Sequence, residues 1–261
     1  MRTNRNIETL DLASATEWYA WVSKIQGETV PEYDKFGNLT GKQVQAMQLN
    51  IATTKPDEKD AYMGKVAKND ITKLRFENKR DVNLYNRNLE EDPMVNIKRI
   101  NCPKKVQMPK DMSKTFMGCF NLEDAGDLKN FDTSKVKNMD SLFDGCKNLK
   151  NLDLSNWEVL NVTKMQYMFW GCKNLVILNV SNWNTSNVIS MWRMFCNCKS
   201  LIFLDVSNWD TSSVMDMEAM FRGCCSLEKL DTSNWNVSKT TDIRSMFYNC
   251  PKEIIPSWYE D

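Results

Sequence analysis

The chain has 261 residues, of which 34 are Lys or Arg and 34 are Asp or Glu, so its formal net charge is zero. It therefore lacks the basic excess that usually drives nucleic-acid binding. It contains no His, which excludes Ser-His-Asp and Cys-His triads, H-E-x-x-H zinc sites and His-based acid–base catalysis. With 42% hydrophobic residues, the composition is typical of a globular protein.

Residues 1–94 carry no internal repeat, and their short apolar stretches with helix-start signals predict a small, mainly helical domain. Residues 71–76 predict a strand within it. The predicted helices are one from Trp18 to Ile25 after the capping box Ser14–Glu17, one that contains Val44, Met47 and Ile51, and one from Pro56 to Val66.

From residue 95 to residue 261, a 26-residue period organises the sequence. Six phenylalanines recur at spacings of 27, 26, 26, 26 and 26 residues, and each is followed three residues later by a cysteine. Columns of Trp and Asn keep the same period. In-register columns over five periods predict a solenoid of five to six stacked coils. The phenylalanines are Phe116, Phe143, Phe169, Phe195, Phe221 and Phe247.

Two hydrophobic rhythms alternate within each period. Residues 136–146 place apolar side chains at helical spacing after a possible N-cap in 132–134, which predicts a helix of about three turns. Leu152 and Leu154 alternate with polar residues, as in a strand with one buried face. One such unit cannot bury its apolar side alone, so the coils must stack with their strands in a parallel sheet. The predicted strands are 151–155, 177–181, 203–207 and 229–233.

The consensus L-x-x-L-D-(L/V)-S-N-W-(D/N)-T-S-x-V-x-x-M-x-x-M-F-x-x-C resembles the 26-residue repeat of BspA-like, leucine-rich-repeat-type bacterial surface proteins. The likeness is clearest over Cys119–Cys250 and fades over Asp111–Cys119. It implies an α/β repeat solenoid of right-handed, leucine-rich-repeat-like coils. It also implies a role in binding or adhesion rather than catalysis.

Nine Cys without a visible secretory signal indicate free thiols in a reducing compartment. We therefore expect a location in the cytoplasm or in a particle assembled in the cytosol, and at the cell surface only if a signal has been removed. No stretch of 18 apolar residues exists, so no membrane span is expected.

The repeated columns each allow a structural and a functional interpretation. The Cys column fits a buried small apolar position, with a soft-metal site at Cys196/Cys198 or Cys224/Cys225 as the alternative. The Trp column is either buried or an aromatic binding stripe. The Asp column either bonds neighbouring Ser and Asn residues or receives a basic partner or a cation. We expect no cofactor, no resident metal and no catalytic residue.

Outward strand positions differ between coils, whereas inward positions repeat almost unchanged. Ile177 and Phe203 would then be exposed apolar residues within a polar rim, a common mark of a protein interface. The alternative is that the N-terminal domain or Trp258–Tyr259 covers them. The candidate partner-binding residues are Asn151, Ile177, Phe203 and Lys229, with Asp153, Asn179, Asp205 and Asp231 of the Asp column.

These patterns favour a non-enzymatic protein-interaction module, with the strand face or the N-terminal domain as the site for a protein partner. A structural or decoration subunit of a larger assembly, such as a phage or virus particle, is the alternative. An enzyme within residues 1–95 is a third option, but the carboxylates there form no recognisable constellation.

Overall fold

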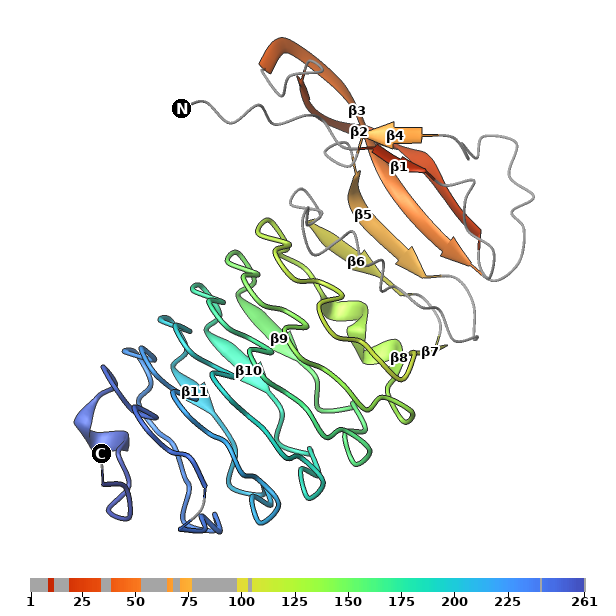
Figure 1. Ribbon diagram of the computed structural model, residues 1–261. Helices are drawn as coiled ribbons and strands as arrows, with labels where there is room; N and C mark the ends of the chain where they lie inside the picture. Colours follow the sequence, from red (N-terminus) through yellow and green to blue (C-terminus); the bar gives the residue numbers. More distant parts are fainter. Residues whose placement is uncertain are drawn as a thin grey trace.

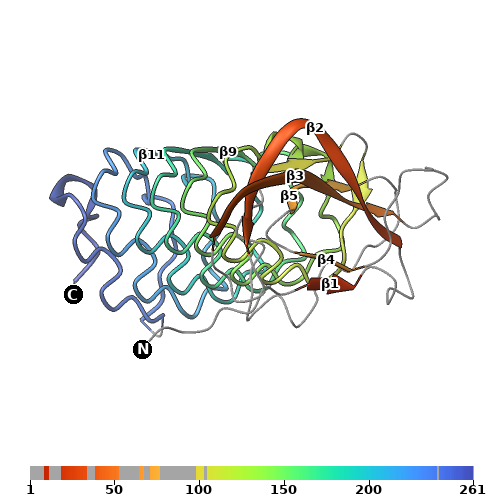
Figure 2. The ribbon, with the colours of Figure 1, turned by 90° about the horizontal axis from the view of Figure 1, so that it is seen from above.

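The computed structural model describes residues 9–11, 19–33, 39–52, 65–67, 71–76, 98–102, 105–239 and 241–260. The chain forms a stack of coils with a group of strands at its N-terminal end (Figure 1). Seen from above, the coils follow one another as similar loops from β9 to the C-terminus (Figure 2). The predicted repeat solenoid is therefore confirmed.

The strands nearest the N-terminus form two sheets. In the larger sheet β2 pairs antiparallel with β3, β3 pairs parallel with β5, and β5 pairs parallel with β6. In the smaller sheet β1 pairs antiparallel with β4. The bounds are β1 Thr9–Asp11, β2 Tyr19–Tyr33, β3 Leu39–Ala52, β4 Lys65–Ala67, β5 Ile71–Phe76 and β6 Arg99–Asn101.

These strands correct the prediction of a mainly helical N-terminal domain. The first two predicted helices lie in β2 and β3, and the third falls largely on residues outside the described ranges, with Val66 in β4. The prediction of a strand at 71–76 is confirmed by β5. In β3, Met47, Leu49 and Ile51 alternate with Gln48 and Asn50, so a period of two competes with the helical spacing and pairing with β2 decides the outcome.

β6 connects the N-terminal sheet to the solenoid. Arg99 pairs with Lys73 of β5 on one side and forms a parallel bridge with Asp124 of the first coil on the other. A sheet edge left open at this point would expose unpaired backbone groups. The N-terminal strands therefore continue the stacking of the coils. A domain boundary at residue 94 stays a prediction.

The coils contribute very short parallel strands. β7 (Val106–Gln107) pairs with β8 (Phe131–Asp132). β9 (Asn151–Asp153), β10 (Ile177–Asn179) and β11 (Phe203–Leu204) form a second parallel sheet, which a bridge from Phe203 to Lys229 extends by one coil. They coincide with the predicted strands but are shorter.

The predicted helix in each coil is wrong. In the described residues from 98 on, the helical segments are the 3₁₀ helices η4 (Gly126–Asn130) and η5 (Lys252–Ile254). Residues 136–146 instead form consecutive turns in which the N–H of Leu142 donates to Met139 O and that of Cys146 to Phe143 O. Each such turn advances the chain by three residues, so inward side chains acquire nearly the spacing of a helix.

The intervening N–H groups bond to the next coil. Met139 donates to Lys164 O at 3.0 Å, Phe143 to Met168 O at 2.8 Å and Gly145 to Trp170 O at 2.7 Å. The same ladder recurs at the other interfaces between the six coils that carry the repeated phenylalanines. In a continuous α-helix these N–H groups would donate to carbonyl groups of the same helix. Their bonds to the next coil therefore exclude a helix in this segment.

The turns require left-handed backbone at two positions in each coil. The first position has φ between 52° and 58° and holds non-glycine residues such as Tyr167 and Arg193. The second has φ between 60° and 76° and holds Gly or Asn, the residue types that adopt this conformation most easily. The second set is Gly118, Gly145, Gly171, Asn197, Gly223 and Asn249.

Two aromatic columns fill the interior. The phenylalanine rings stack from Phe116 to Phe247 with centroids 5.4–5.6 Å apart. The Trp column is buried beside them, which excludes a binding stripe. The indole N–H of Trp157, Trp183, Trp209 and Trp235 donates to a backbone carbonyl of the preceding coil at 2.9–3.4 Å. Each buried indole N–H therefore has a hydrogen-bond acceptor. Stacking of the rings adds about 0.5–1.5 kcal/mol of stability per aromatic pair.

Replacing Gly171 by Ala tests the left-handed turn position. Gly171 has φ +67° and no atom within 4 Å of an added Cβ, so the cost is conformational alone. We expect the free energy of unfolding to fall by about 1 kcal/mol in urea titrations. Gly126→Ala is the matched control, because its backbone is not left-handed, and it should change stability little. Equal stability of the two variants would contradict this account of the turn.

Candidate interaction surface

The predicted outward row forms one continuous ladder. Ile177 pairs with Asn151 on one side and with Phe203 on the other, and Phe203 bridges to Lys229. Ile177 is 54% exposed and Phe203 is 51% exposed. Leu178, the next residue along β10, points to the other face of the strand and is buried in the core, as the alternation of side chains in a strand requires. The structure thus brings all four predicted row residues together.

A second row enlarges the exposed apolar area. The N–H of Val176 donates to Lys150 O, that of Ile202 to Val176 O and that of Glu228 to Ile202 O. Ile202 is exposed and Val176 is half-buried. Sequence reasoning missed this row, although it varies between coils in the same way as the row of Ile177. We call Val176, Ile177, Ile202 and Phe203 the apolar patch.

Polar residues border the apolar patch in the neighbouring coils. Lys150 and Asn151 precede it, and Glu228 and Lys229 follow it, all four exposed. An apolar centre within a polar rim is the usual anatomy of a protein interface.

The C-terminal residues do not cover the apolar patch. Trp258 and Tyr259 pack edge-on against Phe247 of the last coil, with ring centroids 6.4 and 5.0 Å away. The C-terminus lies at the end of the stack opposite the N-terminal strands (Figure 1). The alternative that they fold over Ile177 and Phe203 is therefore wrong. Side chains of the N-terminal strands lie outside the described residues.

The side chains of the Asp column accept hydrogen bonds within the turns that follow the strands. The Oδ1 atom of Asp205 accepts the backbone N–H of Ser207 at 3.1 Å and its hydroxyl at 2.7 Å. These bonds cap the turn. In Asp231 the backbone bond from Ser233 lowers the carboxyl pKa. Asn179 accepts both bonds from Ser181 in the same way, and Asp153 accepts the backbone N–H of Ser155. The column lies beside the predicted row, and its first role is structural.

A second exposed apolar pair lies on another corner of the coils. Ile189 is 46% exposed and Met215 is 68% exposed, and the N–H of Met215 donates to Ile189 O. Sequence reasoning missed this pair because both residues fall in the segment predicted to be helical.

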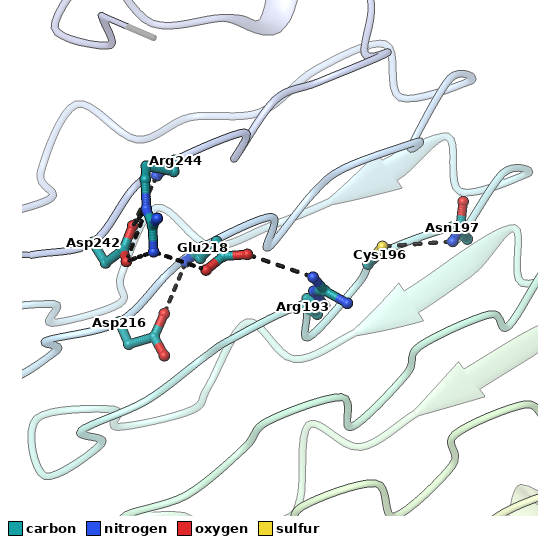
Figure 3. Close-up of polar contacts among 7 residues, drawn as sticks. All are labelled: Arg193, Cys196, Asn197, Asp216, Glu218, Asp242 and Arg244. Atoms are coloured by element: carbon teal, nitrogen blue, oxygen red, sulfur yellow. Dashed lines mark hydrogen bonds and ion pairs between the residues drawn. The ribbon is translucent and has the colours of Figure 1, made fainter.

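Charged side chains form a chain of contacts across three coils. Glu218 lies between Arg193 at 3.5 Å and Arg244 at 3.2 Å, and Arg244 also pairs with Asp242 at 2.6 Å (Figure 3). Exposed ion pairs of this kind contribute about 0–1 kcal/mol each. Because each charge faces an opposite one, the row does not attract a partner of either sign.

The repeated cysteines act as hydrogen-bond donors, and all of them are buried except Cys250, which is half-buried. The Sγ atoms of Cys146, Cys172, Cys198, Cys224 and Cys250 lie 3.0–3.2 Å from the phenylalanine carbonyl of the preceding coil. Burial raises the pKa of the Cys119 thiol to about 12. Such thiols stay protonated at neutral pH and are poor nucleophiles.

In the described part of the chain, no group of three or more His, Cys, Asp or Glu side chains is placed to hold a metal ion.

Alkylation separates the buried thiols from the exposed one. Cys225 is exposed, so we expect iodoacetamide at neutral pH to modify it well before the buried column, as read by mass spectrometry. Cys225→Ser should remove the fast step, and unfolding in urea should make the remaining thiols react together. Fast modification of Cys172 or Cys198 in folded protein would contradict the assigned burial.

Asp144 gives the fold a dependence on pH. Burial raises the pKa of its carboxyl from 3.8 to about 6. The folded state therefore holds this proton more tightly than the unfolded state, and stability decreases as pH rises from about 4 to about 6. Asp144→Asn should be more stable than the unchanged protein at pH 8, and this advantage should vanish near pH 4. Urea titrations at both pH values measure it, with the exposed Glu123→Gln as control. An advantage independent of pH would contradict the assignment.

None of the described helices is long and apolar enough to cross a membrane.

Comparisons with known proteins place the repeats in a family. No curated protein matches the chain. A crystal structure of a leucine-rich repeat protein from Eubacterium ventriosum ATCC 27560 is 12% identical, with a TM-score of 0.30, over 83% of this chain and 95% of that one; this likeness is too distant to support an argument. Residues 103–179 and 171–255 match the family described as "Mycoplasma protein of unknown function, DUF285". Because these matches span more than half of the chain, the protein belongs to the DUF285 family.

Proposed function

We propose that the solenoid is a non-enzymatic protein-interaction module that binds a protein partner through the apolar patch and its polar rim. The observation that carries the proposal is the exposure of Ile177 and Phe203 side by side on a rigid ladder. Contiguous apolar residues exposed on a folded protein mark interaction sites more often than scattered ones do.

The rigidity of the ladder favours binding. Ile177 and Phe203 lie on strands whose backbone is held on both sides by neighbouring coils, so little backbone entropy is lost when a partner docks. An aromatic residue at the centre of such a patch is a typical energetic hot spot. Phe203 is the aromatic residue of the patch and lies between Ile177 and the rim residue Lys229.

The resemblance to BspA-like repeats supports the same class of function. Those repeats imply binding or adhesion, and the buried Cys and Trp columns have structural partners within this fold. The outward side chains are thus the part of each coil that is free to differ.

Ile177→Ser with Phe203→Ser tests the proposal. Because both side chains point away from the core, we expect the melting temperature to stay nearly unchanged, as for surface substitutions in general. Partner capture by the immobilised protein from its own cells should fall sharply, as measured by quantitative mass spectrometry.

The matched control is Ile189→Ser with Met215→Ser, which removes a similar exposed apolar pair on another corner. This variant should retain the partners that the patch variant loses. Equal capture by the two variants would contradict a binding role for the patch, and unfolding of the patch variant like a core mutant would contradict its assigned exposure.

A further inference from the structure

A hollow of about 260 Å³ opens on the corner of the coils that precedes the strands. Three lysines from successive coils line it, together with one exposed aromatic residue and three residues of the left-handed turn column. No carboxylate belongs to its lining. The lining residues are Gly145, Lys147, Trp170, Gly171, Lys173, Asn197 and Lys199.

The lysines are held close together by the backbone ladder. The N–H of Gly145 bonds Trp170 O at 2.7 Å and that of Gly171 bonds Cys196 O at 2.8 Å. These bonds keep neighbouring coils about 4.8 Å apart, as in a sheet. Each coil thus adds one exposed lysine to the row, which gives the hollow a local excess of positive charge.

None of the described carboxylates neutralises this row. Within the part of the chain that the structure describes, no carboxylate forms an ion pair with Lys147, Lys173 or Lys199. Lys147 instead contacts an aromatic ring: its Nζ lies 4.3 Å from the centroid of Phe120. The arrangement contrasts with that of Glu218, which lies between two arginines.

The lysine ammonium groups are the main groups that could bind an anionic ligand in the hollow. Several of its backbone donors are occupied, since the N–H of Lys173 bonds Gly171 O and the N–H groups of Gly145 and Gly171 bond the next coil. Lysine ammonium groups are flexible point charges without the fork geometry of arginine. They therefore suit a ligand with repeated anionic groups rather than one oxyanion held in a fixed orientation.

Trp170 adds a flat apolar surface. It lines the hollow and is 38% exposed. The C–H groups on one side of a pyranose ring are apolar and slightly positive, which suits the negative face of an indole.

We propose that this hollow binds an acidic polysaccharide with one carboxylate on each sugar ring. In an extended 1,4-linked chain of such sugars, alternate rings present their carboxylates on the same side, and two ring lengths are close to two coil steps. Carboxylates of alternate rings can therefore face Lys147 and Lys199, at the two ends of the row, while a ring stacks on Trp170. Nucleic acid is the less suitable polyanion, because its binding draws on a broad basic excess and this chain has a net charge of zero. The site is separate from the apolar patch and does not depend on its function.

Calorimetric titration with oligogalacturonate tests the proposal. We expect binding at low salt that weakens as salt is added, and no binding of the methyl-esterified oligomer, which has the same chain without the charge. The variant Lys147→Gln, Lys173→Gln, Lys199→Gln should bind about tenfold more weakly or worse, since each exposed ion pair contributes modestly. These lysines are exposed, so the variant should melt like the unchanged protein.

The control variant is Lys135→Gln, Lys137→Gln, Lys164→Gln, which removes three exposed charges outside the hollow and should bind as the unchanged protein does. Absence of binding at low salt, or equal losses in the two triple variants, would overturn the proposal. So would binding of polyglutamate or oligo-dT as tight as that of oligogalacturonate, because the hollow would then select charge without sugar. None of these outcomes bears on the apolar patch.

Discussion

The main-chain ladder between coils is the constraint on which the rest of the structure depends. On the turn side, alternate N–H groups from Met139 to Gly145 bond the next coil, and on the other side β9, β10 and β11 pair in parallel. With both sides fixed, residues of the coils that follow the coil of Phe143 lie above their counterparts 26 positions earlier. Phe169 therefore meets Phe143, and Trp183 reaches the carbonyl of Leu154. Loss of the left-handed turns would break this register on one whole side.

The ladder also explains which features could be predicted from sequence. Stacking demands that inward positions repeat, so the period, the strand positions and the outward row of Ile177 and Phe203 follow from comparing the coils with one another. The turn segment could not be recognised in this way, because consecutive three-residue turns place Met139, Leu142 and Phe143 on one side just as a helix would. The signal that separates the two is the recurrent Gly or Asn at position 145 and its counterparts, which a helix interior disfavours.

The N-terminal strands illustrate a different limit. β2 and β3 are long strands that pair over many residues, and their pairing depends on contacts between segments that each carry helix-compatible spacing. Local patterns around Val44 and Met47 did not distinguish the two outcomes, because β propensity depends strongly on the neighbours that a strand acquires. A region without repeats offers no internal comparison, so the correct pairing was not accessible from its own residues.

Similar backbones in successive coils confine function to short rows of side chains. The lysine row begins after Phe120 and ends before Cys225, its counterparts in the flanking coils, and so spans two coil steps, about 10 Å. The apolar patch likewise ends at Lys150 and Lys229. Because the ladder holds the backbone fixed, the side chains of the two surfaces can differ without disturbing the core or each other. Since the net charge of the chain is zero, the electrostatic field near each row is set mainly by the residues of that row. In this fold a new binding surface therefore requires changes at only two or three counterpart positions in adjacent coils.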